Sequence, residues 1–367
     1  MSRPRRTTLA VPGSNPRMID KARGLAVDAL FLDLEDAVSP LVKVEARATV
    51  ISALQEGGFG DRLVTVRVNS PSSPWCRDDI DAVVRQAAGR FDTLLVPKVQ
   101  TVADVQAITS QLDHLENECG LERGSIKIDI QIEDALGLVN VEAIAASSSR
   151  IESLSFGPAD FMASINMKSL VVGLQPSGYV EGDAYHYVLM RILVAGRAFG
   201  LQVLDGPYLG IKDLDGLRLT SARSSALGFD GKWVLHPDQI DIVNDVFSPS
   251  QADFDHAQRI LEAYELSTSA QGGARGAVML GDEMIDEASR KMALVISAAG
   301  RAAGLSRSTA GGGFRSAARC AASARASGTA VTDTVGGIPA AAAICVVRRP
   351  SSRATCASGW WRSPPTR

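Results

Sequence analysis

Eight short hydrophobic runs follow one another along the chain up to residue 237, and helix-like sequence separates each run from the next. Every run stops abruptly at a proline, a glycine or a charged residue. Strands that alternate with helices form parallel sheets, and eight such units close into a barrel. We therefore predict an α/β fold, a (β/α)8 TIM barrel, whose strands lie within residues 8–13, 29–36, 63–69, 93–99, 127–134, 153–160, 202–208 and 232–237.

The sequence divides into three parts, with the barrel in residues 1–245, C-terminal helices and a lid in 246–305, and a tail in 306–367. In the second part, residues 246–265 show apolar residues at helical spacing, and Ser248 or Ser250 can cap this helix. A flexible polar tether, 267–276, precedes a compact acidic loop and a second amphipathic helix within 277–304. A tethered helical unit is typical of a mobile lid, although a helix packed on its own barrel fits the pattern equally well.

The tail, residues 306–367, differs from the rest of the chain in composition. It contains nine Arg, no Lys and one Asp, whereas the whole chain has a formal net charge of −3. Ala, Ser, Gly, Thr and Arg dominate and apolar periodicity disappears, so the tail cannot build a packed core. An Arg-rich tail can be a nucleic-acid arm, but the abrupt loss of Lys and Glu favours an out-of-frame reading of a GC-rich gene. We expect disorder in either case.

Composition excludes several classes of protein. The net charge of −3 gives no reason to expect a nucleic-acid partner, and no stretch is long and apolar enough to span a membrane. The basic N-terminus runs directly into the first strand without the apolar segment of a signal peptide, so we expect a cytoplasmic protein. The five cysteines show no spacing typical of a zinc site or a disulfide framework, which favours reduced thiols.

Charged residues stand where the predicted strands end, which is where such barrels carry their chemistry. These candidates are Asp33, Glu35, Arg67, Lys98, Glu133, Asp160 and Asp205. Glu133 and Asp160 end the fifth and sixth strands, so barrel geometry places their carboxylates side by side. Two hard oxygen ligands without His or Cys suit Mg2+. A carboxylate pair can instead act as acid and base, as in glycosidases, but aromatic residues are only 5% of the chain and no sugar cleft is evident.

Arg67 ends the third predicted strand, in a run that should otherwise be buried. A buried guanidinium needs an anionic partner, because leaving it unpaired is costly. That partner is either the substrate, whose carboxylate or enolate oxygens match the planar fork, or Asp33 or Glu35 in a structural ion pair. Asp33, Glu35 and Asp36 repel one another unless a cation or several donors lie nearby. We expect them to orient Arg67 and the metal-bound waters from outside the ligand sphere, while direct metal ligation by one of them stays open.

The loop after the first strand has the features of a weak phosphate site. It supplies a tight turn at Pro12 and Gly13, an N-cap at Ser14 or Asn15, Pro16 at the first helical position, and cations at Arg17, Lys21 and Arg23. A helix N-terminus with basic residues favours phosphate, but the spacing is not that of a P-loop.

Lys98 follows the fourth strand and has two interpretations. It is placed to form a Schiff base if the chain is a lysine-dependent aldolase, or it pairs with the acids at the barrel mouth. The predicted metal site favours the second interpretation. His186 and His236 lie near strand or loop ends, but neither has a second His at ligand spacing, which favours structural roles.

Nine motifs together resemble the malyl-CoA lyase branch of the citrate lyase β-subunit-like aldolase family. They stand in the family's order and spacing from about Thr7 to about Gly304, and they read VPGSNPRMIDKA, FLDLEDAV, VRVN, LLVPKV, QIEDALGL, FGPADFMASI, DGPY, GFDGKWVLHPDQI and GDEMIDEASRK. The resemblance implies a TIM barrel, a homotrimer or homohexamer, dependence on Mg2+ with Mn2+ as a substitute, and a substrate carried on coenzyme A.

The resemblance also implies roles for single residues. Glu133 and Asp160 would ligate Mg2+, and Arg67 would face the reacting oxygens. The catalytic acid, which the family delivers on a C-terminal lid from a neighbouring subunit, falls on Asp286, with Asp282 as a nearby rival. The residues implied to border the substrate are Ala10, Val11, Asn15, Lys21, Ala159, Leu204 and Asp205. Asn15 stands where some relatives carry Arg, which leaves the phosphate contacts of that loop open.

The implied reaction is the reversible cleavage of (S)-malyl-CoA to acetyl-CoA and glyoxylate. A citramalyl-CoA or β-methylmalyl-CoA lyase, or a malyl-CoA thioesterase, would use nearly the same site, because acyl specificity depends on pocket shape. A non-catalytic alternative is a CoA-ester binding subunit of a larger assembly, like the citrate lyase β-subunit. The length of the resemblance and the intact acids favour a self-sufficient enzyme.

Overall fold

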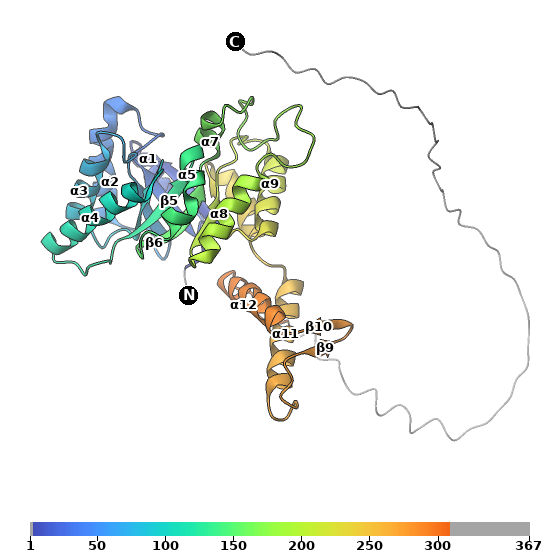
Figure 1. The fold of residues 1–367 in the computed structure, drawn as a ribbon. Helices are drawn as coiled ribbons and strands as arrows, with labels where there is room; N and C mark the ends of the chain where they lie inside the picture. The colour runs from blue at the N-terminus through green and yellow to red at the C-terminus, as the bar shows by residue number, and fades with distance from the viewer. Residues whose placement is uncertain (1–2, 309–367) are drawn as a thin grey trace, which may run out of the picture. The chain divides into compact units, whose positions relative to one another are not determined.

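A closed barrel of eight parallel strands forms the centre of the computed structural model, which describes residues 3–308. Neighbouring strands pair in chain order from β1 to β8, and β8 pairs back onto β1. The strands are β1 (Thr7–Pro12), β2 (Ala29–Asp33), β3 (Leu63–Arg67), β4 (Thr93–Val96), β5 (Lys127–Ile132), β6 (Ile151–Phe156), β7 (Gln202–Asp205) and β8 (Gly231–Val234). The predicted TIM barrel is therefore confirmed, and Figure 1 shows its helices around the strands.

Helices connect successive strands. They are α1 (Pro16–Ala22), α2 (Lys43–Glu56), α3 (Cys76–Ala87), α4 (Val102–Glu118), α5 (Ala135–Val139), α6 (Val141–Ala145), α7 (Pro158–Ser164), α8 (His186–Ala198), α9 (Leu214–Leu227) and α10 (Ile240–Val246), with the short 3-10 helices η1 (Pro40–Val42) and η2 (Pro237–Gln239). Within residues 3–308, no helix has the length and apolar character needed to cross a membrane.

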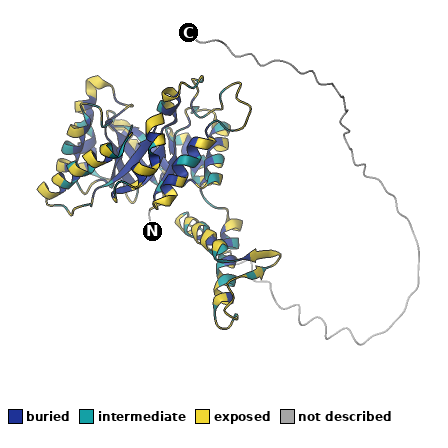
Figure 2. Cartoon of the chain, viewed as in Figure 1, coloured by how far each residue is buried: buried dark blue, intermediate teal, exposed yellow. Residues whose placement is uncertain are grey.

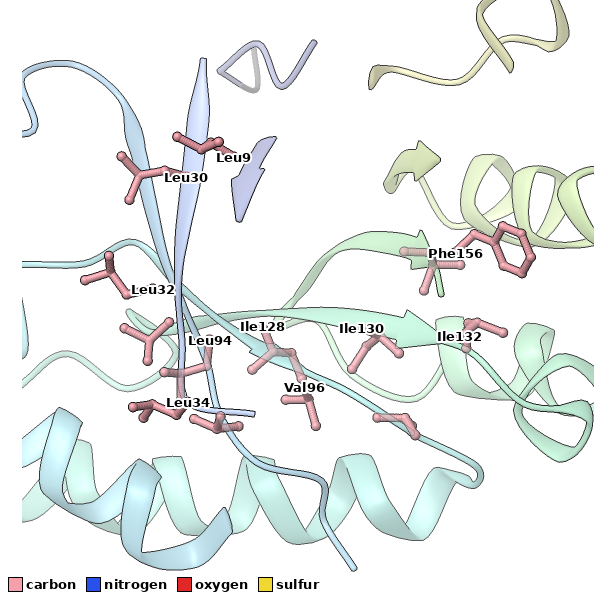
Figure 3. Packing of buried hydrophobic residues seen from close by; sticks show 14 of the residues in the cluster. Leu9, Leu30, Leu32, Leu34, Leu94, Val96, Ile128, Ile130, Ile132 and Phe156 are labelled. Carbon is pink, nitrogen blue, oxygen red and sulfur yellow. The ribbon is translucent and has the colours of Figure 1, made fainter. Parts of the chain in front are cut away.

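Alternate side chains of the strands point away from the barrel axis and pack beneath the helices. On β2 these are Leu30 and Leu32, on β4 Leu94 and Val96, and on β5 Ile128, Ile130 and Ile132, all fully buried in one large cluster. Figure 2 shows that buried residues concentrate in the barrel, and Figure 3 shows these side chains on their strands. Because side chains alternate along a strand, the residues between them face the interior.

The barrel interior is polar near the N-terminal ends of the strands. Arg5 Nη1 donates to Asp129 Oδ1 at 2.8 Å, and Ser153 Oγ donates to the same oxygen at 2.6 Å. Thr93 Oγ1 donates to Asp129 Oδ2 at 2.7 Å, so this buried carboxylate has a cation and two hydroxyl groups around it. A separate apolar layer consists of Phe31, Leu95, Leu204 and Trp233.

The predicted strand runs extended past the strands into the loops that follow. The clearest case is Asp160, which we expected at the end of the sixth strand and which lies in the first turn of α7. β6 ends at Phe156, and Pro158 begins α7 because its fixed φ suits the first helical position. In the first loop, the Asn15 side chain accepts a hydrogen bond from the Met18 N–H at 3.2 Å, which confirms the predicted cap of α1.

The C-terminal helices α11 (Gln251–Thr268) and α12 (Glu287–Ala302) pack on each other around a cluster of their own that includes Ala257, Ile260, Ile285 and Ala293. Ser250 caps α11, accepting a hydrogen bond from the Asp253 N–H at 3.1 Å, as one of the two predicted caps. Residues 309–367, which hold almost all of the tail for which we predicted disorder, lie outside the described residues.

The acidic segment before α12 is a β-hairpin and not the loop that we expected. Its strands are β9 (Val278–Leu280) and β10 (Glu283–Ile285), which pair antiparallel. Val278, Leu280 and Ile285 contribute to the apolar cluster of α11 and α12. The turn uses Gly281 with φ of 65°, a conformation that glycine adopts at low cost. Each strand has only three residues, so the alternation of apolar side chains is too short to predict a strand from the sequence.

Glu116, near the C-terminal end of α4, is fully buried and links this helix to Arg150 and to the loop before β5. Arg150 Nη1 donates to Glu116 Oε1 at 2.8 Å, and the N–H groups of Gly124 and Ile126 donate at 2.7 and 2.9 Å. Burial alone would raise the pKa of Glu116, but Arg150 and the two N–H groups lower it to about 2. The ionised carboxylate therefore stabilises the loops that lead into β5 and β6.

Replacing Glu116 with Gln is expected to lower the free energy of unfolding by roughly 3 kcal/mol at neutral pH. The folded pKa lies below the unfolded one, so the stabilisation is complete above pH 4.5 and disappears as the pH falls towards 2. Urea unfolding between pH 7 and pH 2.5 measures this, and the gap between wild type and variant should close at low pH. Glu122→Gln, at an exposed position nearby, is the control. A gap of constant size across this pH range would contradict the assignment.

Candidate active site

Arg67, the last residue of β3, is buried and forms a two-pronged ion pair with Asp33, the last residue of β2. Its Nε lies 2.7 Å from Asp33 Oδ1 and its Nη2 lies 2.6 Å from Asp33 Oδ2. The remaining amino group, Nη1, lies 3.4 Å from Glu35 Oε2 and 3.4 Å from Gln131 Oε1. The structural ion pair that we considered for Arg67 is thus present, and it holds the guanidinium rigidly.

Two aromatic rings lie beside the guanidinium of Arg67 in the interior of the barrel. Its Cζ lies 5.3 Å from the centre of the Phe31 ring and 5.7 Å from that of the Trp233 ring. Burial by itself would lower the pKa of Arg67, but the charges of Asp33 and the neighbouring carboxylates raise it above its ordinary value. Arg67 is therefore a permanent, oriented positive charge at the carboxyl end of the barrel.

Glu133 directly follows β5, and its side chain is buried. Its Oε1 accepts a hydrogen bond from the Lys98 N–H at 2.7 Å, and its Oε2 accepts one from Gln131 Nε2 at 2.5 Å. Burial raises the pKa of Glu133 well above its ordinary value, Arg67 opposes this, and the charge of Asp160 adds to it. A cation beside this carboxylate would favour its charged form.

Asp160 and Glu133 line the same cavity at the carboxyl ends of the strands. The cavity has a volume of about 150 Å3, and its walls are Ala10, Phe31, Asp36, Arg67, Gln131, Glu133, Gly157, Pro158, Ala159, Asp160, Pro207, Trp233 and Leu235. Glu133 and Asp160 also line a second, more polar cavity of about 270 Å3, to which Ser70, Ser72, Gln100 and Ser164 contribute. The structure thus brings Arg67, Glu133 and Asp160 together as predicted.

Lys98 lies among the acids of the barrel mouth. Its Nζ lies 2.5 Å from Glu35 Oε1, 3.2 Å from Asp36 Oδ1 and 3.9 Å from Asp160 Oδ2. Burial would lower the pKa of Lys98, but the hydrogen bond to Glu35 and the acidic charges raise it above its ordinary value. A Schiff base requires the neutral amine, so the structure favours our second interpretation of Lys98 as an ion-pair partner.

Glu35 and Asp36 follow β2 at the barrel mouth, and their expected role in orienting Arg67 and metal-bound waters stays a prediction. Burial raises the pKa of Glu35 despite the nearby charge of Arg67 and the hydrogen bond from Lys98. Both carboxylates are held by Lys98, and Glu35 also lies beside Arg67. Neither Asp33 nor Glu35 is a wall of the cavity, whereas Asp36 is. Direct metal ligation by one of these three acids stays an open prediction.

Other predicted substrate contacts lie in different surroundings. Ala10 and Ala159 line the cavity, whereas Val11 packs into the main hydrophobic cluster. Leu204 lies in the apolar layer inside the barrel. Asp205, the last residue of β7, is buried and accepts hydrogen bonds from Lys232 Nζ at 2.6 Å and Ser224 Oγ at 2.6 Å. The Asp205 carboxylate therefore links β8 to α9 through hydrogen bonds in the structure.

The residues predicted for phosphate and for acid catalysis are not among the residues that line the described cavities. Asn15 is engaged as the cap of α1, and Lys21 is exposed on that helix. Asp286 caps α12, accepting hydrogen bonds from the N–H groups of Ala288 at 2.9 Å and Ser289 at 3.1 Å. The Ser289 hydrogen bonds lower the pKa of Asp286, which favours the ionised carboxylate. No described cavity includes Asp282 or Asp286 in its walls.

The donor set at the cavity fits Mg2+. Within residues 3–308, no group of three or more His, Cys, Asp or Glu side chains is placed to hold a metal ion. Mg2+ requires fewer protein ligands, because one or two carboxylates suffice when waters and substrate oxygens complete the octahedron. Burial is the main cause of the raised pKa of Glu133, with the charge of Asp160 adding to it, and a divalent cation beside the two carboxylates would favour the ionised form of Glu133.

Sequence reasoning missed four contributors to the site. Gln131 stands two residues before Glu133 on β5 and faces the same side, so strand alternation was the signal for it. Trp233 and Phe31 come from strands that are distant in sequence, and no local pattern places them around Arg67. Gly157 is required by close packing, because a Cβ there would lie 2.4 Å from Glu133 Cβ and 2.7 Å from Gln131 Nε2.

Comparisons with known proteins all find similarity to aldolases and lyases of one family. The HpcH/HpaI aldolase/citrate lyase family matches residues 6–237. The L-malyl-CoA/beta-methylmalyl-CoA lyase of Cereibacter sphaeroides is 36% identical over 304 residues, 80% of this chain and 94% of that protein. The (3S)-malyl-CoA thioesterase of the same species is 37% identical over 262 residues, 71% of this chain and 84% of that protein. The crystal structure of Mycobacterium tuberculosis CitE with magnesium, acetoacetate and coenzyme A superimposes with a TM-score of 0.63 at 26% identity, covering 83% of this chain and 99% of that one.

Replacing Gly157 with Ala is expected to destabilise the protein by about 1–3 kcal/mol, because the new methyl group overlaps Glu133 and Gln131. The backbone of Gly157 has φ of −103°, so the cost comes from crowding and not from backbone strain. Urea unfolding measures the change. Gly24→Ala is the control, since its Cβ would have its nearest neighbour at 3.9 Å. Equal stability of the two variants would show that Gly157 is not tightly packed.

Proposed function

Because this chain belongs to the HpcH/HpaI aldolase/citrate lyase family, we propose that it is a Mg2+-dependent carbon–carbon lyase that cleaves (S)-malyl-CoA reversibly to acetyl-CoA and glyoxylate. One observation carries the proposal, namely that Arg67, Glu133 and Asp160 line a single cavity at the carboxyl end of the barrel. Barrel enzymes hold their catalytic residues at this end. The 36% identity with a malyl-CoA lyase over 304 residues supports the choice of substrate.

The residues of the cavity would have different roles in the cleavage of the carbon–carbon bond. Glu133 and Asp160 would hold Mg2+, which when bound polarises substrate oxygens as a Lewis acid. Arg67 would stabilise negative charge that develops on the departing thioester enolate, an effect that is large in a site closed to water. The Asp33 carboxylate keeps the guanidinium in one orientation, so no reorganisation is needed during the reaction.

Asp286 is our candidate for the group that exchanges a proton with the methyl carbon of acetyl-CoA. Its carboxylate is anchored at the N-terminus of α12, in the helical unit that we interpret as a lid. The cavity walls lack this aspartate, which supports delivery by the lid of a neighbouring subunit in a homotrimer or homohexamer. Closing the lid would place a base beside the substrate and exclude water.

We also propose which residues contact the CoA ester. Ala10 and Ala159 line the cavity and would border the acyl group. Asn15, Lys21 and the backbone of Val11 would follow the CoA chain along the first loop, while Leu204 and Asp205 would support the acyl end through β7. The M. tuberculosis CitE structure holds magnesium and coenzyme A, which supports both as ligands here, and Mn2+ is the expected substitute for Mg2+.

A thioesterase is the second candidate, because a (3S)-malyl-CoA thioesterase is 37% identical over 262 residues. Hydrolysis needs a water molecule at the thioester, and the two reactions share the substrate and the metal. β-Methylmalyl-CoA and citramalyl-CoA are alternative substrates for the lyase, and CoA-ester binding without turnover is the non-enzymatic alternative. A cytoplasmic location stays our prediction.

Product analysis tests the proposed function. Purified protein is incubated with (S)-malyl-CoA in Mg2+ and after EDTA treatment, and glyoxylate, acetyl-CoA, malate and free CoA are measured. We expect glyoxylate with Mg2+ and none with EDTA. The Glu133→Gln variant should lose kcat/KM by on the order of 100-fold or more, because a metal ligand is removed. Free CoA and malate without glyoxylate would establish the thioesterase instead, and tight CoA-ester binding without turnover would establish a binding subunit.

Exchanging Asp286 for Asn is expected to lower kcat by about 10²–10⁴-fold, the usual contribution of a general acid or base. Asp282→Asn is the matched control, since Asp282 lies in the hairpin turn four residues earlier. Mixed oligomers that combine Asp286→Asn subunits with Arg67→Met subunits should recover activity if the lid crosses between subunits. Full activity in Asp286→Asn, with loss in Asp282→Asn, would assign the role to the rival residue.

A further inference from the structure

Lys98 has a backbone conformation that is costly for any residue with a Cβ. Its φ is 53°, and among the described residues only Asn166 and Ala274 also combine a side chain with a positive φ. The left-handed conformation costs on the order of 1–2 kcal/mol for an L-residue other than glycine. Such strain persists where the surroundings enforce it, and it concentrates at functional sites.

The left-handed turn at Lys98 directs a backbone donor at a proposed metal ligand. The Lys98 N–H donates to Glu133 Oε1 at 2.7 Å, while Gln131 Nε2 donates to Oε2 at 2.5 Å. Together the two donors fix both oxygens of a buried carboxylate. A Cβ at Gly157 would lie 2.4 Å from the Glu133 Cβ, so the side chain has little room to move elsewhere.

The side chain of the same residue holds the strained turn in place. The ammonium lies 2.5 Å from Glu35 Oε1 and 3.2 Å from Asp36 Oδ1, two acids that follow β2. The Lys98 side chain is about a third exposed, whereas the Glu35 side chain is almost fully buried. The β2 acids therefore attach the turn after β4 to a neighbouring part of the barrel mouth.

We propose that Lys98 is a positioning residue for the divalent metal, whose strained backbone aims its N–H at Glu133 and whose ammonium anchors that backbone to Glu35 and Asp36. The inference rests on the proposed Mg2+ site. Positioning of Glu133 depends on the backbone N–H of residue 98. A residue that adopts the left-handed turn without strain should therefore position Glu133 without the ammonium anchor. Glycine adopts that turn freely, whereas a β-branched residue resists it most.

The test compares two variants that both lack the ammonium. We expect Lys98→Gly to bind Mg2+ about 10-fold more tightly than Lys98→Val, because valine drives the turn out of the left-handed region. Calorimetric titration of the EDTA-treated variants with Mg2+ alone measures this, without reference to turnover. Equal dissociation constants for the two variants would overturn the proposal, since loss of the charge is common to both.

Two controls separate the possible causes. Ala274→Gly and Ala274→Val change a residue with φ of 51° outside the described cavities, and they should bind Mg2+ equally well. If Lys98→Val does not fold, Lys98→Ala replaces it, with an expected loss of about 3-fold or more relative to Lys98→Gly.

Glu133→Gln decides whether the underlying metal site is correct. If this variant binds Mg2+ like wild type, the proposed metal site itself is wrong. If it loses Mg2+ binding while Lys98→Gly and Lys98→Val bind the ion equally well, only the role of Lys98 is refuted.

Discussion

Side-chain alternation on eight parallel strands is the constraint on which the rest of this structure depends. Leu30 and Leu32 face the helices and bury apolar surface, so Phe31 and Asp33, which alternate with them along β2, must face the interior or the mouth. The same alternation on β5 sends its isoleucines outwards and Asp129, Gln131 and Glu133 inwards. One physical rule thereby builds the hydrophobic core and, on the opposite face of the same strands, a row of polar groups that ends in the candidate active site.

Charge balance at the barrel mouth follows from that arrangement. Asp33 and Arg67 compensate each other within a two-pronged pair, and Lys98 compensates Glu35 and Asp36. Glu133 receives two hydrogen bonds, but its pKa stays well above the ordinary value because burial and the charge of Asp160 oppose ionisation. A cation bound beside Glu133 and Asp160 would favour the ionised form of Glu133, and the left-handed turn at Lys98 contributes to the geometry of that carboxylate.

The barrel and the C-terminal helices have separate hydrophobic clusters. The barrel cluster includes Phe247, and the cluster of α11, α12 and the hairpin starts at Ala257. Tight packing of α12 on α11 is evident at Gly300, where a Cβ would lie 2.2 Å from the Phe254 ring. The proposed delivery of Asp286 to a substrate requires a unit that moves as a body, and a separate hydrophobic cluster is compatible with such motion.

The sequence by itself determined the barrel, the order of its strands, the caps of α1 and α11, and the convergence of Arg67, Glu133 and Asp160, because these depend on local periodicity and on the shared direction of parallel strands. The hairpin before α12 was missed, since three-residue strands leave too little alternation to detect. Only the tertiary structure decided that Asp205 is paired with Lys232, that Phe31 and Trp233 hold Arg67, and that Lys98 adopts a left-handed turn to reach Glu133. Those features are contacts between segments distant along the chain, and their distances and backbone angles are set by how the closed barrel packs.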